Sequence, residues 1–464
     1  METHGMALFC LLCLVLHGGA AISSRTSDSM ELWGYAKPRP KVNIFWWYYK
    51  SPQRVSSPVK PWPTVVWLQG GPGGSGVGRG NFLEIGPLDL NLKPRKFTWL
   101  HKADLIFVDS PVGVGYSYAE DPSAMVKTDL QTATDMVDVL KALVMEIPTL
   151  RNSPLFLVGE SYGGKLAAMI GISLARAIHD GTVHLTLGGV VIGDGWISPD
   201  DFTLSYAQLL HDVSRLNDNA VGDANKMAVT VKEQMVAGQF AAALKTWTDL
   251  LNLIDSKSDS VNMHNFLLDT GMDPVFASSS SLRSTQLMHH NHQASQSASN
   301  TIDGIMNGVI KQKLKIIPKD VVWHEATFEI YDALANDFMK PAIDEVDELL
   351  SYGVNVVVYN GQSIFLYLKL DVICPTVGVE AWVNKLKWHG LKNFLGLPRQ
   401  PLHYCDSPIY CSKLIKAYVR SYKNLCFYWI LQAGHMVPVD QPYAAFRMIA
   451  SITQTPMHYA SNLE

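Results

Sequence analysis

The chain has 464 residues, enough for one large α/β domain with an insertion or for two or three ordinary domains. Its 38 Lys and Arg residues against 42 Asp and Glu residues give a formal charge of -4, and no long basic run interrupts the sequence. This balance argues against a nucleic acid as the main partner, so the function must be inferred from motifs.

The first 21 residues have the pattern of a secretory signal. Residues 6–16 form an apolar stretch of 11 residues, and small residues follow through Ala21. The stretch is too short to span a bilayer, and cleavage is expected near Ala20 or Ala21. No Lys or Arg precedes it, so an N-terminal anchor is the alternative. We expect residues 1–21 to be a signal peptide and the mature chain to lack a membrane span. The protein would then be secreted or delivered to a vacuole or lysosome.

Short β-rich apolar runs alternate with helix-compatible segments along most of the chain. The runs expected to be strands are Val42–Tyr49, Val65–Leu68, Leu105–Val108, Leu155–Val158, Val190–Ile192, Val354–Tyr359 and Phe427–Leu431. This alternation predicts a mostly parallel sheet with helices on both faces. We expect this α/β core to comprise residues 30–199 and 318–455.

A glycine-rich loop, residues 69–76, follows the strand expected at Val65–Leu68. Residues 71–76 match the dinucleotide pattern G-x-G-x-x-G, but that site needs a helix opening at the loop and an acid after a second strand about 20 residues on. The segment 87–94 resembles neither, and no Gly-Lys-Ser/Thr follows to form a P-loop. The alternative is an oxyanion loop, in which the Gly71 N–H would reach a developing negative oxygen.

The pentapeptide Gly159-Glu160-Ser161-Tyr162-Gly163 is the most informative feature of the chain. It follows an apolar run and precedes a good helix opening, so the local order is strand, sharp turn, helix. A G-x-S-x-G turn in this setting lifts the serine hydroxyl above the sheet, and the glycines relieve the crowding. We expect Ser161 to be a nucleophile and the Tyr162 amide to be the second oxyanion donor. A plain glycine-rich turn is the alternative.

The character of the sequence changes between residues 200 and 317. Met227–Ile254 reads as helical, and residues 277–300 are rich in Ser, Gln and His. We expect a helical cap inserted into the core, with a polar loop inside it. Three histidines in that loop could bind a metal, but no carboxylate or Cys completes the cluster, so a solvated loop is favoured. These are His289, His290 and His292.

A nucleophilic serine needs a base, and the base needs an orienting acid. In an α/β-hydrolase the acid and then the histidine follow the serine along the chain, each after a later strand. His435 directly follows the strand 427–431, and Gly434 permits the tight turn. The first acidic residue after the strand 354–359 is Asp371, which we expect to orient His435. Its alternative role is to cap a helix N-terminus.

Removal of the signal would leave four cysteines: Cys374, Cys405, Cys411 and Cys426. An even number permits up to two disulfides in an oxidising compartment. Their spacing fits no zinc motif, so structural pairing is favoured over metal binding. Serine acyl-transfer chemistry requires neither a cofactor nor a metal.

Together these motifs resemble the serine carboxypeptidases. The resemblance rests on Trp-Leu-x-Gly-Gly-Pro-Gly at 67–73, Gly-Glu-Ser-Tyr-Gly-Gly at 159–164, Gly-His-Met-Val-Pro at 434–438 and an aromatic, glycine-rich segment at 108–118. It spans about residues 30–450, with the cap least similar. Variants at Gln69 and Gly74 make the chain most similar to the retinoid-inducible branch and its plant carboxypeptidase-like relatives.

The resemblance implies an enzyme that releases C-terminal amino acids from peptides or proteins at acidic pH. It assigns Ser161, Asp371 and His435 to the triad, Gly71 and Tyr162 to the oxyanion hole, Gln69, Glu84 and Glu160 to the substrate carboxylate, and Met436 to the leaving-residue pocket. Two acids beside a buried carboxylate could not all ionise, so the two glutamates would share protons and act as donors at low pH. For Met436 the alternative is core packing. The oligomeric state stays open.

The chain departs from the family pattern in three places. Gln69 stands where Asn is usual, and Gly74 where many members have Cys. Residues 363–369, mostly apolar, interrupt the loop between Asn360-Gly361-Gln362 and Asp371. Such an insertion costs little chain entropy if it loops out, but it could pull Asp371 from the imidazole or reflect an altered splice product or gene-model artefact.

Two other functions follow from these departures. An acyltransferase would use the same triad with an alcohol in place of water. A catalytically impaired member would bind peptides or stabilise a partner, which is expected if Asp371 cannot reach His435.

Overall fold

The computed structural model describes residues 22–25, 30–55, 60–272, 301–362, 370–403 and 414–456. Several predicted features lie outside these ranges: the signal segment 1–21, the insertion 363–369, the histidines His289, His290 and His292, and the cysteines Cys405 and Cys411. No helix among the described residues is both long and apolar enough to cross a membrane.

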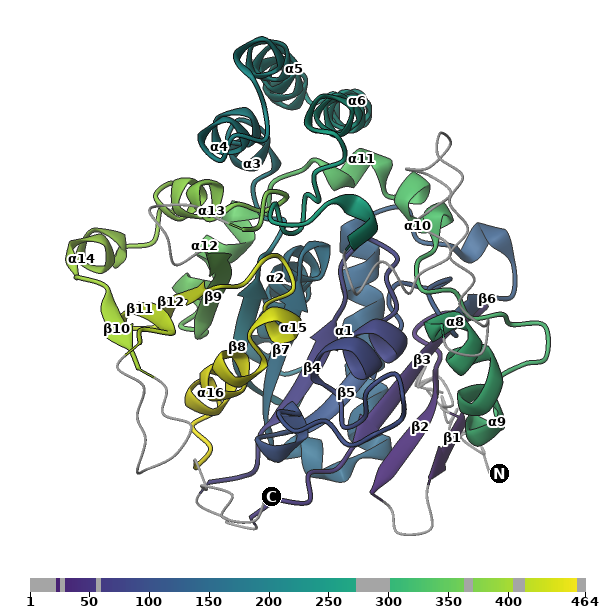
Figure 1. Cartoon of the computed structure of the whole chain (residues 1–464). Helices are drawn as coiled ribbons and strands as arrows, with labels where there is room; N and C mark the ends of the chain where they lie inside the picture. Colours follow the sequence, from purple (N-terminus) through teal and green to yellow (C-terminus); the bar gives the residue numbers. More distant parts are fainter. Residues whose placement is uncertain are drawn as a thin grey trace, which may run out of the picture.

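A large mixed sheet forms the centre of the molecule (Figure 1). Its six middle strands are parallel to one another, in the order β5 (Asp104–Val108), β4 (Thr64–Leu68), β7 (Pro154–Glu160), β8 (Thr186–Gly193), β9 (Val356–Gln362) and β12 (Leu425–Leu431). Antiparallel strands extend both edges: β3 (Val42–Tyr49), β2 (Glu31–Ala36) and β1 (Ile22–Arg25) beyond β5, and β11 (Ala417–Tyr422) and β10 (Gln400–Leu402) beyond β12. A short strand, β6 (Tyr118–Ala119), pairs with β3. The predicted α/β class is confirmed.

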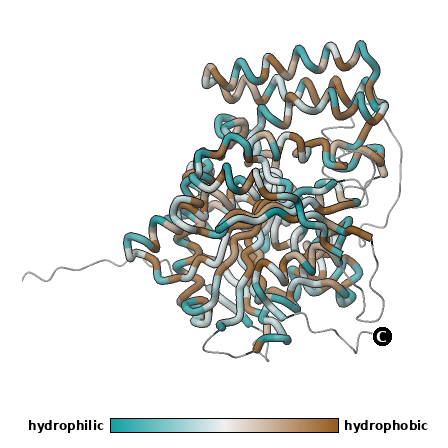
Figure 2. The backbone as a smooth tube through the Cα atoms, turned by 90° about the vertical axis from the view of Figure 1, so that its left-hand side faces the viewer, coloured by the Kyte–Doolittle hydropathy of each residue, from teal (hydrophilic) through white to brown (hydrophobic). Residues whose placement is uncertain are grey.

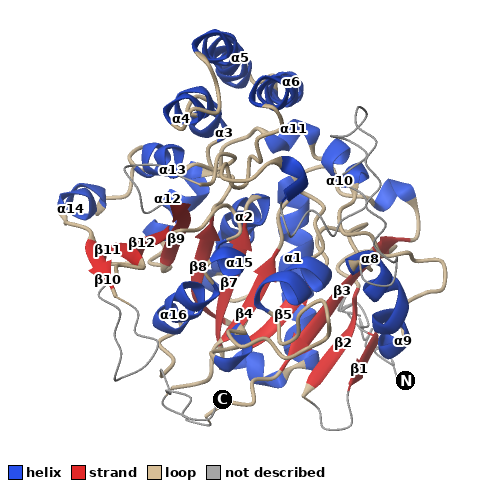
Figure 3. Ribbon diagram, viewed as in Figure 1, coloured by secondary structure: helices blue, strands red, loops and turns tan. Residues whose placement is uncertain are grey.

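The central strands are buried on both faces of the sheet, because alternate side chains of each strand enter different cores. In β3, Trp46 and Tyr48 pack in one cluster, and Trp47 and Tyr49 pack in the other. The first cluster includes residues of α1 (Asp129–Glu146), α2 (Tyr162–His179) and α12 (Ile343–Ser351). The second includes residues of α16 (Pro442–Ile452) and of the segment 302–317. Figure 3 shows the helices arranged around the strands.

Four helices follow β8 and rise above the carboxyl edge of the sheet (Figure 1): α3 (Pro199–Thr203), α4 (Tyr206–Asp212), α5 (Asp218–Val236) and α6 (Phe240–Ser258). The single helical run predicted for Met227–Ile254 is wrong, because the chain turns between α5 and α6. Gly238 has φ 73 there, a conformation that favours glycine and ends a helix. The two helices then pack side by side (Figure 2).

Further helical segments connect these elements. They are η1 (Gly76–Ile85), η2 (Trp99–His101), η3 (Pro122–Ala124), η4 (Pro148–Arg151), η5 (Thr270–Met272), α8 (Ile302–Ile305), η8 (Met306–Ile310), α9 (Lys311–Leu314), α10 (Phe328–Ala333), α11 (Ala335–Phe338), α13 (Thr376–Val383), α14 (Leu391–Gly396) and α15 (Val437–Asp440).

A helix does follow the glycine-rich loop, contrary to the sequence-based expectation. This helix is η1, and it begins at Gly76. The acid that follows the next strand is Asp109, which accepts hydrogen bonds from Ser75 Oγ at 2.5 Å and from the Val77 N–H at 3.1 Å. Asp109 is fully buried and occupied in fixing the loop. Asp109 therefore fixes the loop within the core. A dinucleotide site is excluded because this acid is buried and already bonded to the loop, and not because a helix is missing.

Candidate active site

Ser161 lies at the sharp turn between β7 and α2. Its φ of 60° and ψ of -127° are strained for a residue with a Cβ atom. Its N–H donates to the Gly193 carbonyl at 2.9 Å, and its own carbonyl accepts from the Trp196 N–H at 2.9 Å. These bonds anchor the turn to the end of β8, and the turn has the geometry expected of a nucleophile elbow.

The glycines of the elbow are required by close packing between neighbouring loops. A Cβ on Gly163 would lie 2.1 Å from the Leu68 carbonyl oxygen. A Cβ on Gly70 would lie 2.6 Å from Ser161 Cβ and 3.1 Å from Ser161 Oγ. The loop after β4 therefore passes directly beside the serine, as β4 and β7 are adjacent parallel strands. The neighbouring Gly71 has φ 124, another conformation that favours glycine.

Gly70→Ala should lower kcat/KM by about 100-fold or more, because a methyl group would displace the loop or the nucleophile by a sizeable fraction of an ångström. Steady-state kinetics on a blocked dipeptide would measure this. Gly222→Ala in α5 is the matched control, since a Cβ there meets nothing within 4 Å. Full activity of Gly70→Ala would show that this contact does not shape the site.

The Tyr162 side chain is committed to the core. Its hydroxyl donates to Asp129 Oδ1 at 2.7 Å, and Lys165 Nζ lies 2.8 Å from Asp129 Oδ2. The ring stacks on Phe338 with centroids 5.4 Å apart. Tyr162 is also the first residue of α2, where backbone N–H groups have no intrahelical carbonyl to bond. Its amide, and not its ring, is therefore the group available to an oxyanion.

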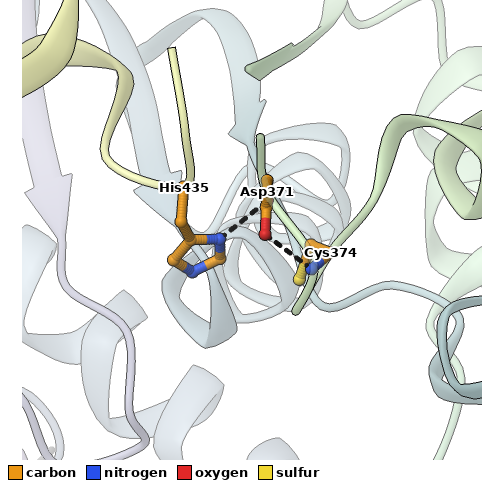
Figure 4. Close-up of side chains that lie close together, drawn as sticks. All are labelled: Asp371, Cys374 and His435. Carbon is orange, nitrogen blue, oxygen red and sulfur yellow. Dashed lines mark hydrogen bonds and ion pairs between the residues drawn. The ribbon is translucent and has the colours of Figure 1, made fainter. Parts of the chain in front are cut away.

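His435 and Asp371 are joined by a hydrogen bond of 2.8 Å between Nδ1 and Oδ2 (Figure 4). The histidine is 4% exposed and the aspartate is fully buried. The other carboxylate oxygen of Asp371 accepts the Cys374 N–H at 2.9 Å. The His435 backbone N–H is held by the His264 carbonyl at 2.8 Å. With Nδ1 bound to the acid, Nε2 remains the nitrogen that can exchange a proton with a nucleophile.

Asp371 does not cap a helix. The nearest helix, α13, begins at Thr376 with Pro375 as its N-cap. Asp371 instead stabilises the preceding turn through the Cys374 N–H while contacting His435. One residue thus carries both contacts, and the helix-cap alternative is wrong.

Cys374 lies beside this pair (Figure 4). One potential ligand atom from each of Asp371, Cys374 and His435 falls within 4.8 Å of the others. Burial raises the pKa of the Cys374 thiol well above its usual value, so the sulfur is held in its protonated form, which is a poor metal ligand. The hydrogen bond between Asp371 and His435 already engages both side chains. Proton transfer accounts for this arrangement better than metal binding does.

Gln69, Glu84 and Glu160 converge from three elements on one buried cluster. Gln69 Nε2 lies 3.0 Å from Glu84 Oε1 and 3.5 Å from Glu160 Oε1. Gln69 Oε1 accepts the Trp67 indole N–H at 2.8 Å, so its amide group must face the two acids. The longer side chain of glutamine therefore still reaches both carboxyl groups.

Burial raises the pKa of both glutamates. For Glu160 the negative charge of Glu84 raises the pKa further, and the pKa lies well above its usual value. Arg79 lowers the pKa of both glutamates, and the contact with Glu160 lowers the pKa of Glu84 further. Glu160 is therefore the member of the pair that keeps its proton to higher pH. Oε2 of each glutamate is buried and accepts no hydrogen bond from the described residues.

Met436, directly after the histidine, is almost fully buried and lies beside Arg79. The Arg79 Nη2 atom is 3.4 Å from Met436 Sδ, and Arg79 Nε is 3.7 Å from Glu325 Oε1. Arg79 is a further residue of the site; it lies on η1 one turn before Glu84. The glycine-rich sequence of η1 does not indicate a helix, so the position of Arg79 could not be predicted from it.

Two further residues at the site were not predicted. The His264 ring, from the segment after α6, lies 5.1 Å from the His435 ring between centroids. Asp194 directly follows β8 and is fully buried beside Asp371. The position of Asp194, after a parallel strand and between Gly193 and Gly195, was a detectable signal. His264 lies in the segment between α6 and η5, away from any strand end, where no pattern would point to it.

Buried acids make folding stability pH-dependent. Burial raises the pKa of Asp109 to about 7, and it raises the pKa of Glu84, Glu160 and Asp194 in the same direction. In the unfolded chain these groups lose their protons near pH 4. The folded state therefore binds more protons between the two values, and stability decreases as the pH rises through this window.

The melting temperature should accordingly fall as the pH is raised from about 4.5 to about 7. Thermal unfolding followed by circular dichroism at a fixed ionic strength would test this. A melting temperature that rises steadily across the same window would contradict the assigned directions.

Comparisons with known proteins agree with this geometry. A family model described as serine carboxypeptidase matches residues 23–455. Serine carboxypeptidase-like 51 of Arabidopsis thaliana is 48% identical, over 97% of this chain and 98% of that protein. The human retinoid-inducible serine carboxypeptidase is 42% identical, over 96% of each chain.

Among solved structures, the prohormone-processing carboxypeptidase Kex1 of Saccharomyces cerevisiae superposes with a TM-score of 0.72 at 22% identity, covering 91% of each chain. This likeness supports the α/β-hydrolase fold. The resemblance inferred from the motifs, including its retinoid-inducible and plant branch, is confirmed. The chain belongs to the serine carboxypeptidase family.

Proposed function

We propose that the chain is a serine-type carboxypeptidase whose triad is Ser161, His435 and Asp371. The observation that supports this most is the 2.8 Å hydrogen bond between His435 Nδ1 and Asp371 Oδ2. It persists although residues 363–369 separate Asp371 from β9. A carboxylate at this position holds the imidazole in the productive tautomer and stabilises its protonated form.

The reaction proceeds through an acyl-enzyme. Ser161 Oγ attacks the last peptide carbonyl while His435 Nε2 takes the hydroxyl proton. The N–H groups of Gly71 and Tyr162 hold the negative oxygen of the tetrahedral intermediate. His435 then protonates the leaving amino acid, the carbon–nitrogen bond breaks, and water activated by His435 releases the acyl group from Ser161.

The cluster of Gln69, Glu84 and Glu160 recognises the free C-terminus. The Gln69 amide and a protonated Glu160 donate hydrogen bonds to the substrate carboxylate. When both glutamates ionise they repel that carboxylate instead. Because burial keeps the pKa of both glutamates raised, the cluster remains a donor in acidic solution and loses this capacity as the pH rises.

Pairs of N-blocked dipeptides that differ only in a free or amidated C-terminus test this assignment. The free acid should have a kcat/KM about 10- to 100-fold higher at acidic pH, as expected for a hydrogen bond from a neutral donor to a charged carboxylate. Equal rates for the acid and the amide would contradict carboxylate recognition.

Glu160→Gln should flatten the pH dependence of KM, because a glutamine amide keeps its donor at every pH. In the wild type KM should rise with pH as the glutamates ionise. The control is Glu233→Gln on the exposed face of α5, which should leave the profile unchanged. An unaltered KM profile in Glu160→Gln would show that Glu160 does not control substrate binding.

The two alternatives predict different products. An acyltransferase would move an acyl group from an acyl-glucose donor to an alcohol and would release little free amino acid from the blocked dipeptide. An impaired binding protein would form neither product. Identifying the products of both incubations therefore separates all three functions.

We also propose that residues 1–21 direct the chain into the secretory pathway, towards secretion or a vacuole or lysosome. We further propose that residues 200–317 form a cap on the core formed by 30–199 and 318–455. N-terminal analysis of the protein recovered from a eukaryotic host should give a first residue near Ala21. A mature protein beginning at Met1 would contradict the signal.

A further inference from the structure

Asp194 is a buried acid that the serine mechanism does not use. It follows β8 with φ 43, a conformation that costs energy for any residue with a side chain. Its N–H donates to the Tyr359 carbonyl at 2.9 Å, and its Oδ1 accepts the Gly361 N–H at 2.8 Å. These two bonds fix both the backbone and the carboxyl group of Asp194 against β9.

The second carboxyl oxygen, Oδ2, has a different environment. It is buried and accepts no hydrogen bond from the described residues. Burial raises the pKa of Asp194 well above its usual value, and the negative charge of the neighbouring Asp371 raises it further. Two neighbouring carboxyl groups can hydrogen-bond to each other only when one of them carries a proton, because two ionised carboxylates have no donor between them.

Asp194 is the member of the pair with a carboxyl oxygen unused by the described residues. Asp371 already accepts from the His435 ring through Oδ2 and from the Cys374 N–H through Oδ1. Asp194 accepts one such bond. Its other titratable neighbours are mostly acidic and come from several elements: Asp440 on α15, Glu160 on β7, Tyr359 on β9, and Cys374 after Asp371.

We propose that Asp194 is a positioning residue, which rests on the triad proposed above. It keeps its proton and donates a hydrogen bond from Oδ2 to the Asp371 carboxylate. Gly361 and Asp371 lie on either side of residues 363–369. Asp194 therefore binds the chain where it leaves β9 and again where the triad acid follows. This bracing holds Asp371 against His435 independently of the length of the intervening segment.

Two substitutions separate this role from simple packing. In Asp194→Asn the amide oxygen can accept the Gly361 N–H and the amide N–H can donate to Asp371, so kcat should stay within about threefold of the wild type. In Asp194→Ala the bond is lost, and kcat should fall about 10- to 100-fold with little change in KM, as expected for a hydrogen bond to a charged group. The control is Asp223→Asn on exposed α5, which should leave both constants unchanged.

The pH dependence of kcat distinguishes this role from a purely structural one, because a structural role would not change it. In the wild type, kcat should decline at the alkaline end as Asp194 loses its proton, while KM rises through the two glutamates. Asp194→Asn has no proton to lose, so the alkaline decline of kcat should disappear or move to higher pH, and the rise in KM should remain.

Ser161→Ala and Asp371→Asn belong in the same series. If either keeps wild-type activity, the proposed triad fails. If both lose activity, wild-type kcat in Asp194→Ala overturns the positioning role alone. A loss in Asp194→Asn as large as that in Asp194→Ala also overturns it. If Asp194→Ala does not fold, the pH profile of Asp194→Asn decides. A decline of kcat at alkaline pH identical to that of the wild type would overturn the positioning role.

Discussion

Ser161→Ala is expected to lower kcat by about 10⁵- to 10⁶-fold, the scale on which serine hydrolases lose activity with their nucleophile. Without Oγ no acyl-enzyme can form, and the residual rate comes only from the oxyanion donors and substrate binding. KM should change little, since the carboxylate cluster of Gln69, Glu84 and Glu160 is left intact.

Steady-state and single-turnover kinetics on one blocked dipeptide would measure this loss, with thermal unfolding as the check on folding. Ser173→Ala, on the same helix as the elbow and away from the turn, is the matched control. A Ser161→Ala protein that retains more than a small fraction of the wild-type kcat would rule out nucleophilic catalysis by this residue.

Asp371→Asn should lower kcat by about 10⁴-fold. An asparagine amide placed against His435 Nδ1 would donate a hydrogen bond to that nitrogen, which favours the imidazole tautomer with its proton on Nε2. That tautomer cannot accept the serine proton. The loss should therefore appear in kcat, with the free-acid preference of the substrate site preserved.

This variant also decides whether residues 363–369 have uncoupled the acid from the triad. If Asp371 were idle in the protein, Asp371→Asn would match the wild type. Glu233→Gln on α5, already used as a control, reports any general effect of removing a carboxylate. Wild-type kcat in Asp371→Asn would favour the catalytically impaired or binding-only alternative.

Local sequence patterns were sufficient for the parts of the site that are built locally. Ser161 stands in a turn whose flanking strand and helix are continuous in sequence, and His435 directly follows a strand. Asp371 could be inferred only from chain order, because its role depends on a contact 64 positions away. The sequence alone therefore cannot distinguish a helix cap from a triad acid at Asp371; the distance between Asp371 Oδ2 and His435 Nδ1 does.

Contacts between distant segments set the limit of prediction. Glu84 and Arg79 lie on a helix rich in glycine, whose sequence has no helical periodicity. The face of the helix that each side chain occupies could therefore not be deduced from the sequence. Asp194 reaches the site because β8 lies between β7 and β9 in the sheet, an order that no local pattern reveals. Gly238 is a sequence signal for the end of α5, and it outweighs the helix-compatible residues on both sides of it.

Covalent labelling by an organophosphonate, located by peptide mass spectrometry, shows whether Ser161 is an activated nucleophile. The probe requires a serine oxygen activated by the histidine and stabilised by the oxyanion donors, the three elements proposed here. We expect one phosphonyl group per chain, on Ser161, with labelling abolished in Ser161→Ala and strongly slowed in Asp371→Asn. Absence of label on Ser161 in the folded wild type at mildly acidic to neutral pH would rule out the proposed triad.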